Sequence, residues 1–171
     1  MTHRETEFEE FLITRGDELF TFAVHLVSDY SKAQDLLQDS LIRLYLKWRV
    51  VRPETRVGYV KRILVRESIN TWRRRRWREQ DPLGVEPLIS EADFTVRADE
   101  NALLLRALAN LPNKQRTALV LRYLHDSSVS ETAKLMGVPP NTVKTLCARA
   151  LENLRADQAL TFEFSEERRH V

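Results

Sequence analysis

Residues 128–155 read SVSETAKLMGVPPNTVKTLCARALENLR, and this pattern predicts two helices joined by a tight turn. Ser128 and Glu131 have capping-box spacing, which marks the start of the first helix. Gly137 lies where that helix ends, because glycine takes up the left-handed conformation of a helix C-terminus without strain. The two prolines that follow pre-set the backbone for the second helix. The segment is therefore predicted as a helix-turn-helix.

The second of these helices has two contrasting faces. An apolar stripe with helical spacing is predicted to pack into the core, and it consists of Val143, Leu146, Cys147, Ala150, Leu151 and Leu154. Side chains predicted to contact duplex DNA are Asn141, Thr142, Lys144, Thr145 and Arg149. Long donors and hydroxyl groups suit a helix that lies in a major groove. The polar outer face of an ordinary helical hairpin is the alternative interpretation.

The charged residues are strongly segregated, although the net charge of the chain is only +2. Residues 43–78 carry 13 basic and 2 acidic side chains, and residues 101–156 carry 8 and 3. Between them, residues 79–100 carry 7 acidic side chains and 1 basic one. Two positive blocks separated by an acidic segment indicate two contacts with one polyanion. Two solvated helix faces are the alternative, but so dense a positive block repels itself unless a partner offsets its charge.

The composition favours a helical globular protein. The 171 residues are 43% hydrophobic and 30% charged, and they include only 4 glycines. Leu, Ala, Arg and Glu dominate, and all four are good helix formers. Because the chain has no run of about 18 uncharged apolar residues, we expect no membrane insertion. The acidic N-terminus has no apolar run typical of a secretory signal, and the single Cys147 fits a reducing cytoplasm.

Apolar residues recur with helical spacing along most of the chain. The pattern predicts helices over residues 8–27, 32–48, 56–77, 99–111 and 113–124. Ser31 and Gln34 have the capping-box signature of the second of these helices. Residues 49–55 contain Pro53 and are predicted as a loop. Residues 79–98 contain two prolines and a glycine without a sustained period, and they are predicted as a linker.

Three segments, in this order, resemble the extracytoplasmic-function (ECF) sigma factors over roughly residues 8–156. The helix-turn-helix, with LPNKQRTALVLRYL before it, resembles region 4, which in that family reads the −35 promoter element. AQDLLQDSLIRLYLKW resembles the region 2 helix that grips the clamp of core RNA polymerase. GYVKRILVRESINTWRRRR resembles the adjoining helix that handles the −10 element. The resemblance implies an all-α fold of two small helical domains.

The resemblance also assigns roles to residues. The residues that it implies bind core polymerase are Asp35, Gln38, Asp39, Leu41, Arg43 and Tyr45. The residues that it implies bind the −10 single strand are Tyr59, Lys61, Arg62, Arg66, Asn70, Trp72, Arg73, Arg74, Arg75 and Arg76. Basic side chains meet phosphates and aromatic rings stack on unpaired bases, although a core position is the alternative for some of the rings. The loop from Val50 to Arg56 matches the place where such factors hold a flipped base.

One residue departs from the family pattern. Sigma factors of this group often have asparagine where this chain has Arg66. Asparagine reads a base edge, whereas arginine brings a longer cationic fork that also suits phosphate. Asn70, one turn further on, is a partial substitute. The −10 sequence preference therefore does not follow from the resemblance.

The resemblance implies a domain plan, partners and a location. Residues 1–80 correspond to the region 2 domain, 81–98 to an acidic linker, 99–158 to the region 4 domain and 159–171 to a C-terminal tail. The implied partners are promoter DNA and the clamp and flap of core RNA polymerase, and an anti-sigma factor is a further partner common in the family. The implied location is the cytoplasm, at the bacterial nucleoid. No cofactor or metal is expected.

Two other classes of function compete with this interpretation. A conventional helix-turn-helix transcription regulator, with an N-terminal domain for sensing or dimerisation, explains the C-terminal half but not the basic block with its aromatic residues. A metal-dependent nuclease needs clustered carboxylates or histidines at ligand spacing. The four histidines are scattered singly, and no nucleophile and base are paired in the sequence. We therefore expect a protein that is not an enzyme.

Overall fold

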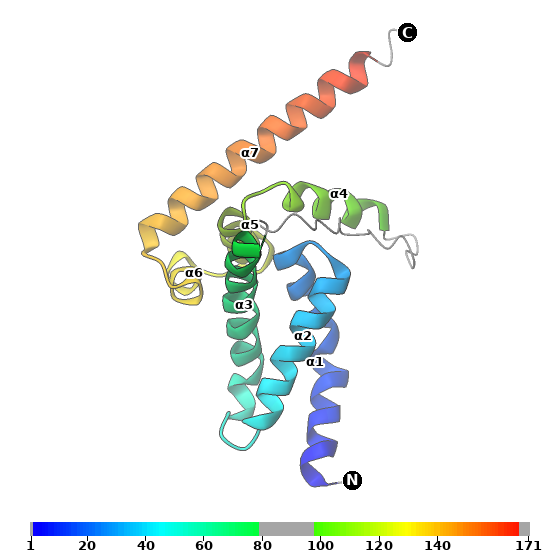
Figure 1. Cartoon of the computed structure of the whole chain (residues 1–171), viewed down its shortest axis with the longest axis vertical. Coiled ribbons are helices and arrows are strands. Elements are labelled where there is room, and N and C mark those ends of the chain that lie inside the picture. The colour runs from blue at the N-terminus through cyan, green and yellow to red at the C-terminus, as the bar shows by residue number, and fades with distance from the viewer. Residues whose placement is uncertain (1, 79–97, 168–171) are drawn as a thin grey trace. The chain divides into compact units, whose positions relative to one another are not determined.

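The structure is a computed structural model. It describes the backbone of residues 2–78 and 98–167, and the side chains of residues 2–70 and 102–158. Every regular element within these residues is a helix (Figure 1). The chain divides into two compact units, Met1–Phe94 and Thr95–Val171. These observations confirm the all-α fold with two helical domains.

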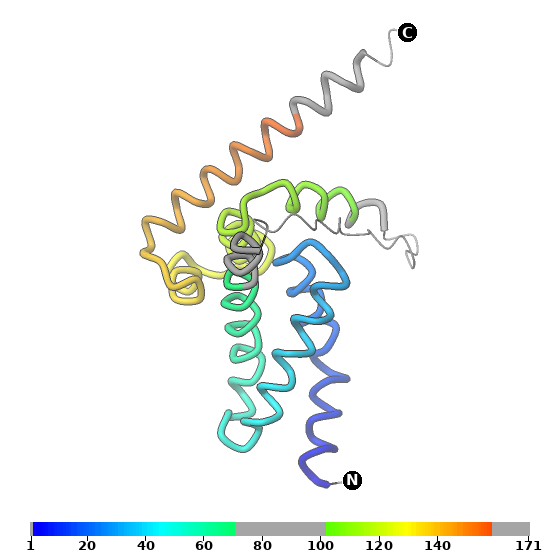
Figure 2. The backbone as a smooth tube through the Cα atoms, viewed as in Figure 1, coloured from blue at the N-terminus to red at the C-terminus, as the bar shows by residue number. Residues whose placement is uncertain are grey.

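The first unit is a bundle of three long helices. α1 spans His3–Val27, α2 spans Tyr30–Leu46 and α3 spans Arg56–Arg78, with a short 3-10 turn, η1, at Pro53–Thr55. Each of the three long helices packs against the other two. Figure 2 shows their three backbones gathered in one bundle. Their apolar faces meet in a core that contains the fully buried side chains Leu19, Phe22, Leu26, Leu44, Val60 and Leu64. The bundle leaves the remaining face of each helix to solvent.

The start of α2 differs from the sequence-based prediction. The predicted capping box of Ser31 and Gln34 is wrong, because the helix begins at Tyr30 with Asp29 as its N-cap. The Asp29 carboxylate accepts a hydrogen bond from the backbone N–H of Lys32 at 2.9 Å. A carboxylate at this position both satisfies a free N–H group and interacts favourably with the helix dipole. Ser28, in the left-handed conformation at φ 54°, ends α1 immediately before it.

The second unit contains the helix-turn-helix. Its elements are α4 (Ala98–Ala109), α5 (Asn113–Leu119), a π-helical turn η2 (Val120–Leu124), α6 (Val129–Met136) and α7 (Pro140–Glu167). α7 packs against both α5 and α6. The buried centre of this packing is formed by Ala118, Ala133, Val143 and Cys147, around which partly buried apolar side chains gather. Cys147 is therefore a core residue, as predicted.

The local signals of the helix-turn-helix are present as predicted. The Ser128 hydroxyl accepts from the Glu131 backbone N–H at 3.0 Å, and the Glu131 carboxylate accepts from the Ser128 N–H at 2.9 Å. Gly137 ends α6 at φ 67°. Two features differ from the expected pattern. The helix predicted over residues 113–124 widens into η2, and α7 runs to Glu167, so the predicted tail begins inside this helix.

Candidate nucleic-acid interface

The face of α7 opposite the core is polar and accessible. Asn141, Lys144, Thr145 and Arg149 are exposed, and Thr142 is half-buried beside them. Val143, Cys147 and Ala150 lie on the buried side of the same helix. The Thr145 hydroxyl donates to the Asn141 carbonyl oxygen at 3.0 Å, which ties it to the helix backbone. All five residues predicted to contact duplex DNA thus border one surface of one helix.

A second polar surface follows α3. Every fourth residue is exposed, and we call the surface formed by Gly58, Arg62, Arg66 and Asn70 the α3 stripe. Because positions four residues apart are neighbours on a helix, the two arginines are adjacent. Neither forms an ion pair with another residue whose side chain is described. The half-buried Tyr59 borders the stripe, at about 60° from Arg62 around the helix.

Two of the predicted contact residues take part in ion pairs between helices. Lys61 of α3 places its Nζ 2.8 Å from Oε1 of Glu18 in α1. On the other side of α3, Oε1 of Glu67 lies 3.0 Å from Nη1 of Arg43 in α2. One ion pair therefore flanks the α3 stripe toward each neighbouring helix. Lys61 and Arg43 have structural partners in addition to the roles predicted for them.

The densest part of the basic block lies outside the described side chains. The backbone of α3 is helical through Arg73, Arg74, Arg75 and Arg76 to its end at Arg78. The side chains of these arginines and of Trp72 and Trp77 are not among those described. Their predicted contacts with single-stranded DNA stay predictions. The described stripe ends at Asn70, directly before them.

Trp48 ties the loop between α2 and α3 to the first turns of α1. Its indole N–H donates to Oε2 of Glu7 at 2.9 Å, and its ring meets that of Phe8 edge-on at a centroid distance of 5.3 Å. The Arg56 guanidinium lies 3.5 Å from the centroid of the Trp48 ring. The indole hydrogen bond holds the pKa of Glu7 below its ordinary value. A single buried ring thus anchors the loop of residues 49–55.

The residues predicted to bind polymerase lie on the outer side of α2. Asp35, Gln38, Asp39 and Arg43 are exposed, whereas Leu41 and Tyr45 are half-buried. Leu41 and Tyr45 border a groove of about 650 Å³ between α1 and α2, which Phe8 and Leu12 also line. We call the outer side of α2 from Asp35 to Leu46 the α2 face. It combines mixed charge with an apolar groove at its edge.

Two apolar residues of the α2 face were not predicted as contacts. Ile42 is 51% exposed and Leu46 is 74% exposed, and both stand among charged neighbours. Exposed apolar side chains rimmed by polar ones are typical of protein-binding surfaces. The sequence does contain a signal for them. Residues 41–46 hold more apolar side chains than a single buried stripe accommodates, so some must face solvent.

Comparison with known proteins identifies the family. Residues 12–78 match the model described as sigma-70 region 2, and residues 101–154 match sigma-70 region 4. The RNA polymerase sigma-E factor of Streptomyces avermitilis is 38% identical over 159 residues, covering 92% of this chain and 88% of the relative. The ECF RNA polymerase sigma factor SigM of Mycobacterium tuberculosis is 32% identical over 71% of this chain and 62% of the relative. The chain belongs to the ECF group of the sigma-70 family.

A solved structure shares the fold of this sigma factor. It is the sigma factor RpoE of Bartonella quintana in complex with the anti-sigma factor NepR, with a TM-score of 0.64 and 25% identity. The match covers 88% of this chain and 95% of that one. The region 2 match contains the α2 face and the α3 stripe, and the region 4 match contains the helix-turn-helix. The sigma factor therefore confers promoter recognition on core RNA polymerase.

Two further observations concern only the described residues of the sigma factor. No three histidine, cysteine, aspartate or glutamate side chains among them come together as metal ligands do. None of the described helices combines the length and the apolar content that crossing a bilayer requires.

Proposed function

We propose that this sigma factor contacts promoter DNA at two separate places, with one helix face in each domain. The α7 face reads the −35 element as duplex, and the α3 stripe with the adjoining arginines holds the −10 strand after it has left the duplex. The supporting observation is that Arg149 and the arginine pair Arg62 and Arg66 are exposed and lie opposite the buried sides of their helices. We retain residues 81–98 as the linker between the two domains.

The α2 face is the proposed contact with core polymerase. Ile42 and Leu46 supply apolar anchors, and the charged residues around them supply a polar rim. The groove between α1 and α2 extends this surface with Leu41 and Tyr45. Such an arrangement suits helix-on-helix packing, because an apolar centre gains from burial while the rim selects the partner.

Energetics explain why this protein acts as a subunit of polymerase. Opening a DNA duplex costs about 1.4 kcal/mol per base-pair step. Stacking one base on an aromatic side chain returns about 1–3 kcal/mol. One or two captured bases therefore start an opening but do not sustain a bubble of many pairs, so core polymerase must hold the rest. We infer that the protein is a specificity subunit without catalytic turnover, which works in the cytoplasm where its DNA is.

Replacing Arg149 with alanine is expected to weaken binding to the promoter by about 1–3 kcal/mol, because the α7 face loses its longest donor to base edges. The measurement compares polymerase reconstituted with wild-type and variant protein on a promoter duplex and on a random-sequence duplex. Arg106→Ala is the matched control, since Arg106 is exposed in the same domain but belongs to α4 and not to α7. An equal loss on both duplexes would contradict base readout by Arg149.

Run-off transcription distinguishes the proposal from a conventional regulator. With purified core polymerase, the protein is expected to start transcription at defined positions on a promoter library, whereas polymerase alone does not. In the absence of polymerase, we expect only weak binding to the same duplexes. Tight, specific binding of intact duplex by the isolated protein, without polymerase-dependent initiation, is the result that would favour the regulator.

A further inference from the structure

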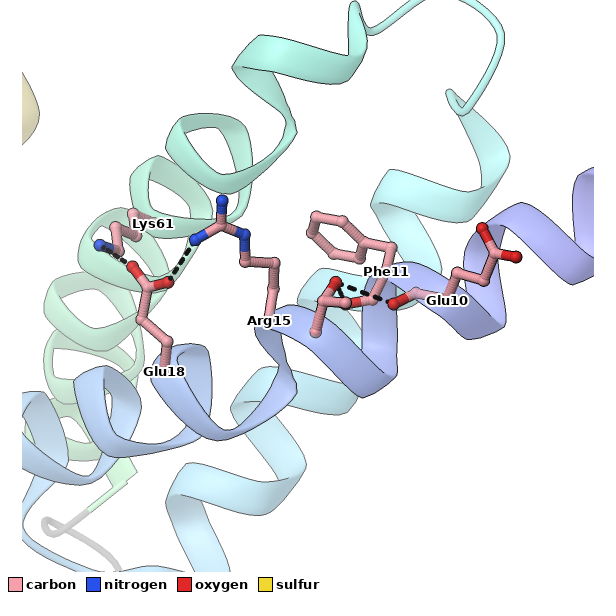
Figure 3. Close-up of polar contacts among 6 residues, drawn as sticks. Glu10, Phe11, Arg15, Glu18 and Lys61 are labelled. Carbon is pink, nitrogen blue, oxygen red and sulfur yellow. Dashed lines mark hydrogen bonds and ion pairs between the residues drawn. The ribbon is translucent and has the colours of Figure 1, made fainter.

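A carboxylate of α1 holds two cationic side chains beside the α3 stripe. Figure 3 shows Glu18 between Arg15, from its own helix, and Lys61, from α3. Oε1 of Glu18 lies 2.8 Å from Nζ of Lys61, and Oε2 lies 3.2 Å from Nη1 of Arg15. The two cations therefore share one anion, and both stand within reach of a ligand that takes its place. We call these three residues the Glu18 triad.

The three side chains of the Glu18 triad differ in how much of their surface is exposed. The side chain of Lys61 is 26% exposed, and its Nζ lies 5.3 Å from the centroid of the Phe22 ring. Glu18 and Arg15 are more accessible, with side chains 42% and 54% exposed. Lys61 is thus fixed at the seam between α1 and α3, whereas the carboxylate and the guanidinium have room to move toward solvent.

The triad lies next to the α3 stripe. Lys61 follows Gly58 by three residues, which puts the two positions about 60° apart around α3. Gly58 has no side chain, and a Cβ placed there would meet nothing within 4 Å. Gly58 lies in the first turn of α3, so this turn presents an open surface beside Lys61. No side chain at position 58 therefore blocks a DNA backbone that runs along the surface from Arg62 to Lys61 and Arg15.

Glu18 is ionised under the conditions in which DNA binds. Its hydrogen bond with Lys61, supported by Arg15, holds the pKa of Glu18 below its ordinary value. The triad accordingly carries two positive charges and one negative charge. A carboxylate oxygen and a phosphate oxygen accept the same charge-assisted hydrogen bonds from lysine and arginine. Lys61 and Arg15, placed to donate to the Glu18 carboxylate, are therefore also placed to donate to a backbone phosphate.

We propose that Arg15 and Lys61 form an additional DNA-backbone contact on α1, and that Glu18 is its internal counter-ion, which a DNA phosphate replaces on binding. This inference rests on the proposed role of the α3 stripe and extends that role to a neighbouring helix. An exposed ion pair contributes little to stability, so its exchange costs the fold little. In the free protein, Glu18 lowers the attraction of this surface for DNA of any sequence.

The test measures the association constant of reconstituted polymerase for a random-sequence single-stranded DNA of fixed length as salt is varied. Glu18→Gln keeps the length of the side chain and an acceptor oxygen for Lys61 but removes the charge. It is expected to steepen the slope of log K against log salt by about 0.7, the value of one phosphate contact on a single strand. Arg15→Ala is expected to flatten the slope by a similar amount. Each change corresponds to about 2.6-fold in association constant over a fourfold change in salt.

Controls separate the alternatives. Asp17→Asn makes the same charge change on α1 but lies about 100° from Glu18 around the helix, and it is expected to leave the slope unchanged. The double variant Arg62→Ala, Arg66→Ala reports on the α3 stripe itself. If that variant flattens the slope while Glu18→Gln and Arg15→Ala do not, the triad is purely structural and only the inference fails.

Four outcomes are decisive. An equal effect of Asp17→Asn and Glu18→Gln would overturn the inference, because net charge alone would then account for the change. If none of these variants alters the slope, both the inference and the role of the α3 stripe are wrong. A lower melting temperature of Glu18→Gln with no gain in DNA affinity would also overturn it, whereas the two opposite slope changes would support it.

Discussion

Replacing Trp48 with alanine is expected to lower the free energy of unfolding of the N-terminal bundle by about 3–5 kcal/mol. Only 2% of the Trp48 surface is exposed, and its ring contacts Phe8 and Phe11 edge-on. The truncation leaves a cavity between α1 and the loop before α3. It also removes the ring on which the Arg56 guanidinium lies, and the Nε of this guanidinium is buried without a hydrogen-bond partner.

The change in stability is measured by urea unfolding of the full chain, with separate transitions fitted for the two units because a two-domain chain does not unfold in one step. Trp48→Phe is the matched variant. It keeps an aromatic ring but loses the N–H that donates to Glu7, so a smaller loss is expected. A loss below about 1 kcal/mol for Trp48→Ala would mean that the loop is anchored elsewhere.

Placing two carboxylates on the α2 face is expected to have the second large effect. The double variant Ile42→Asp, Leu46→Asp should weaken binding to core polymerase by about 2 kcal/mol or more, the range of interface hot spots. This corresponds to about 30-fold in dissociation constant. Both side chains are more than half exposed, so the fold loses little burial and the melting temperature should change little. The loss arises because a charge must be desolvated where an apolar anchor was buried.

The binding measurement is a competition between labelled wild-type protein and unlabelled variants for a limiting amount of core polymerase. Ile13→Asp is the matched control, because Ile13 is 82% exposed on α1 but does not line the groove beside the α2 face. It is expected to compete as well as the wild type does. Competition by the double variant within threefold of the wild type would remove the α2 face from the polymerase contact.

Much of the candidate DNA interface was predictable because its signals are local. The family resemblance assigned Arg62, Arg66 and Asn70, and their four-residue spacing puts them on one side of any α-helix whose apolar residues lie on the other. The same reasoning places Lys144 and Arg149 opposite the buried Val143. Neither prediction requires knowledge of what the helix packs against, only that it packs on its apolar face.

Prediction was less successful where two local signals competed. Ser31 with Gln34 and the single Asp29 each suit the start of α2, and the structure uses Asp29. The end of α1 at Ser28 decided this, because it leaves Asp29 in the extended conformation that an N-cap requires. The widening of the helix at Val120–Leu124 has no comparable local signature.

By itself, the amino-acid sequence determined the helices, most of their ends, the two cationic faces and membership of the sigma family. These properties depend on hydrogen bonds and side-chain spacing within about one or two turns of helix. Only the tertiary structure decided the pairing of Lys61 with Glu18, 43 residues away, and of Trp48 with Glu7, 41 residues away. Such partners are set by the packing of three helices against one another, and no periodicity along the chain encodes which exposed charges or rings that packing brings together.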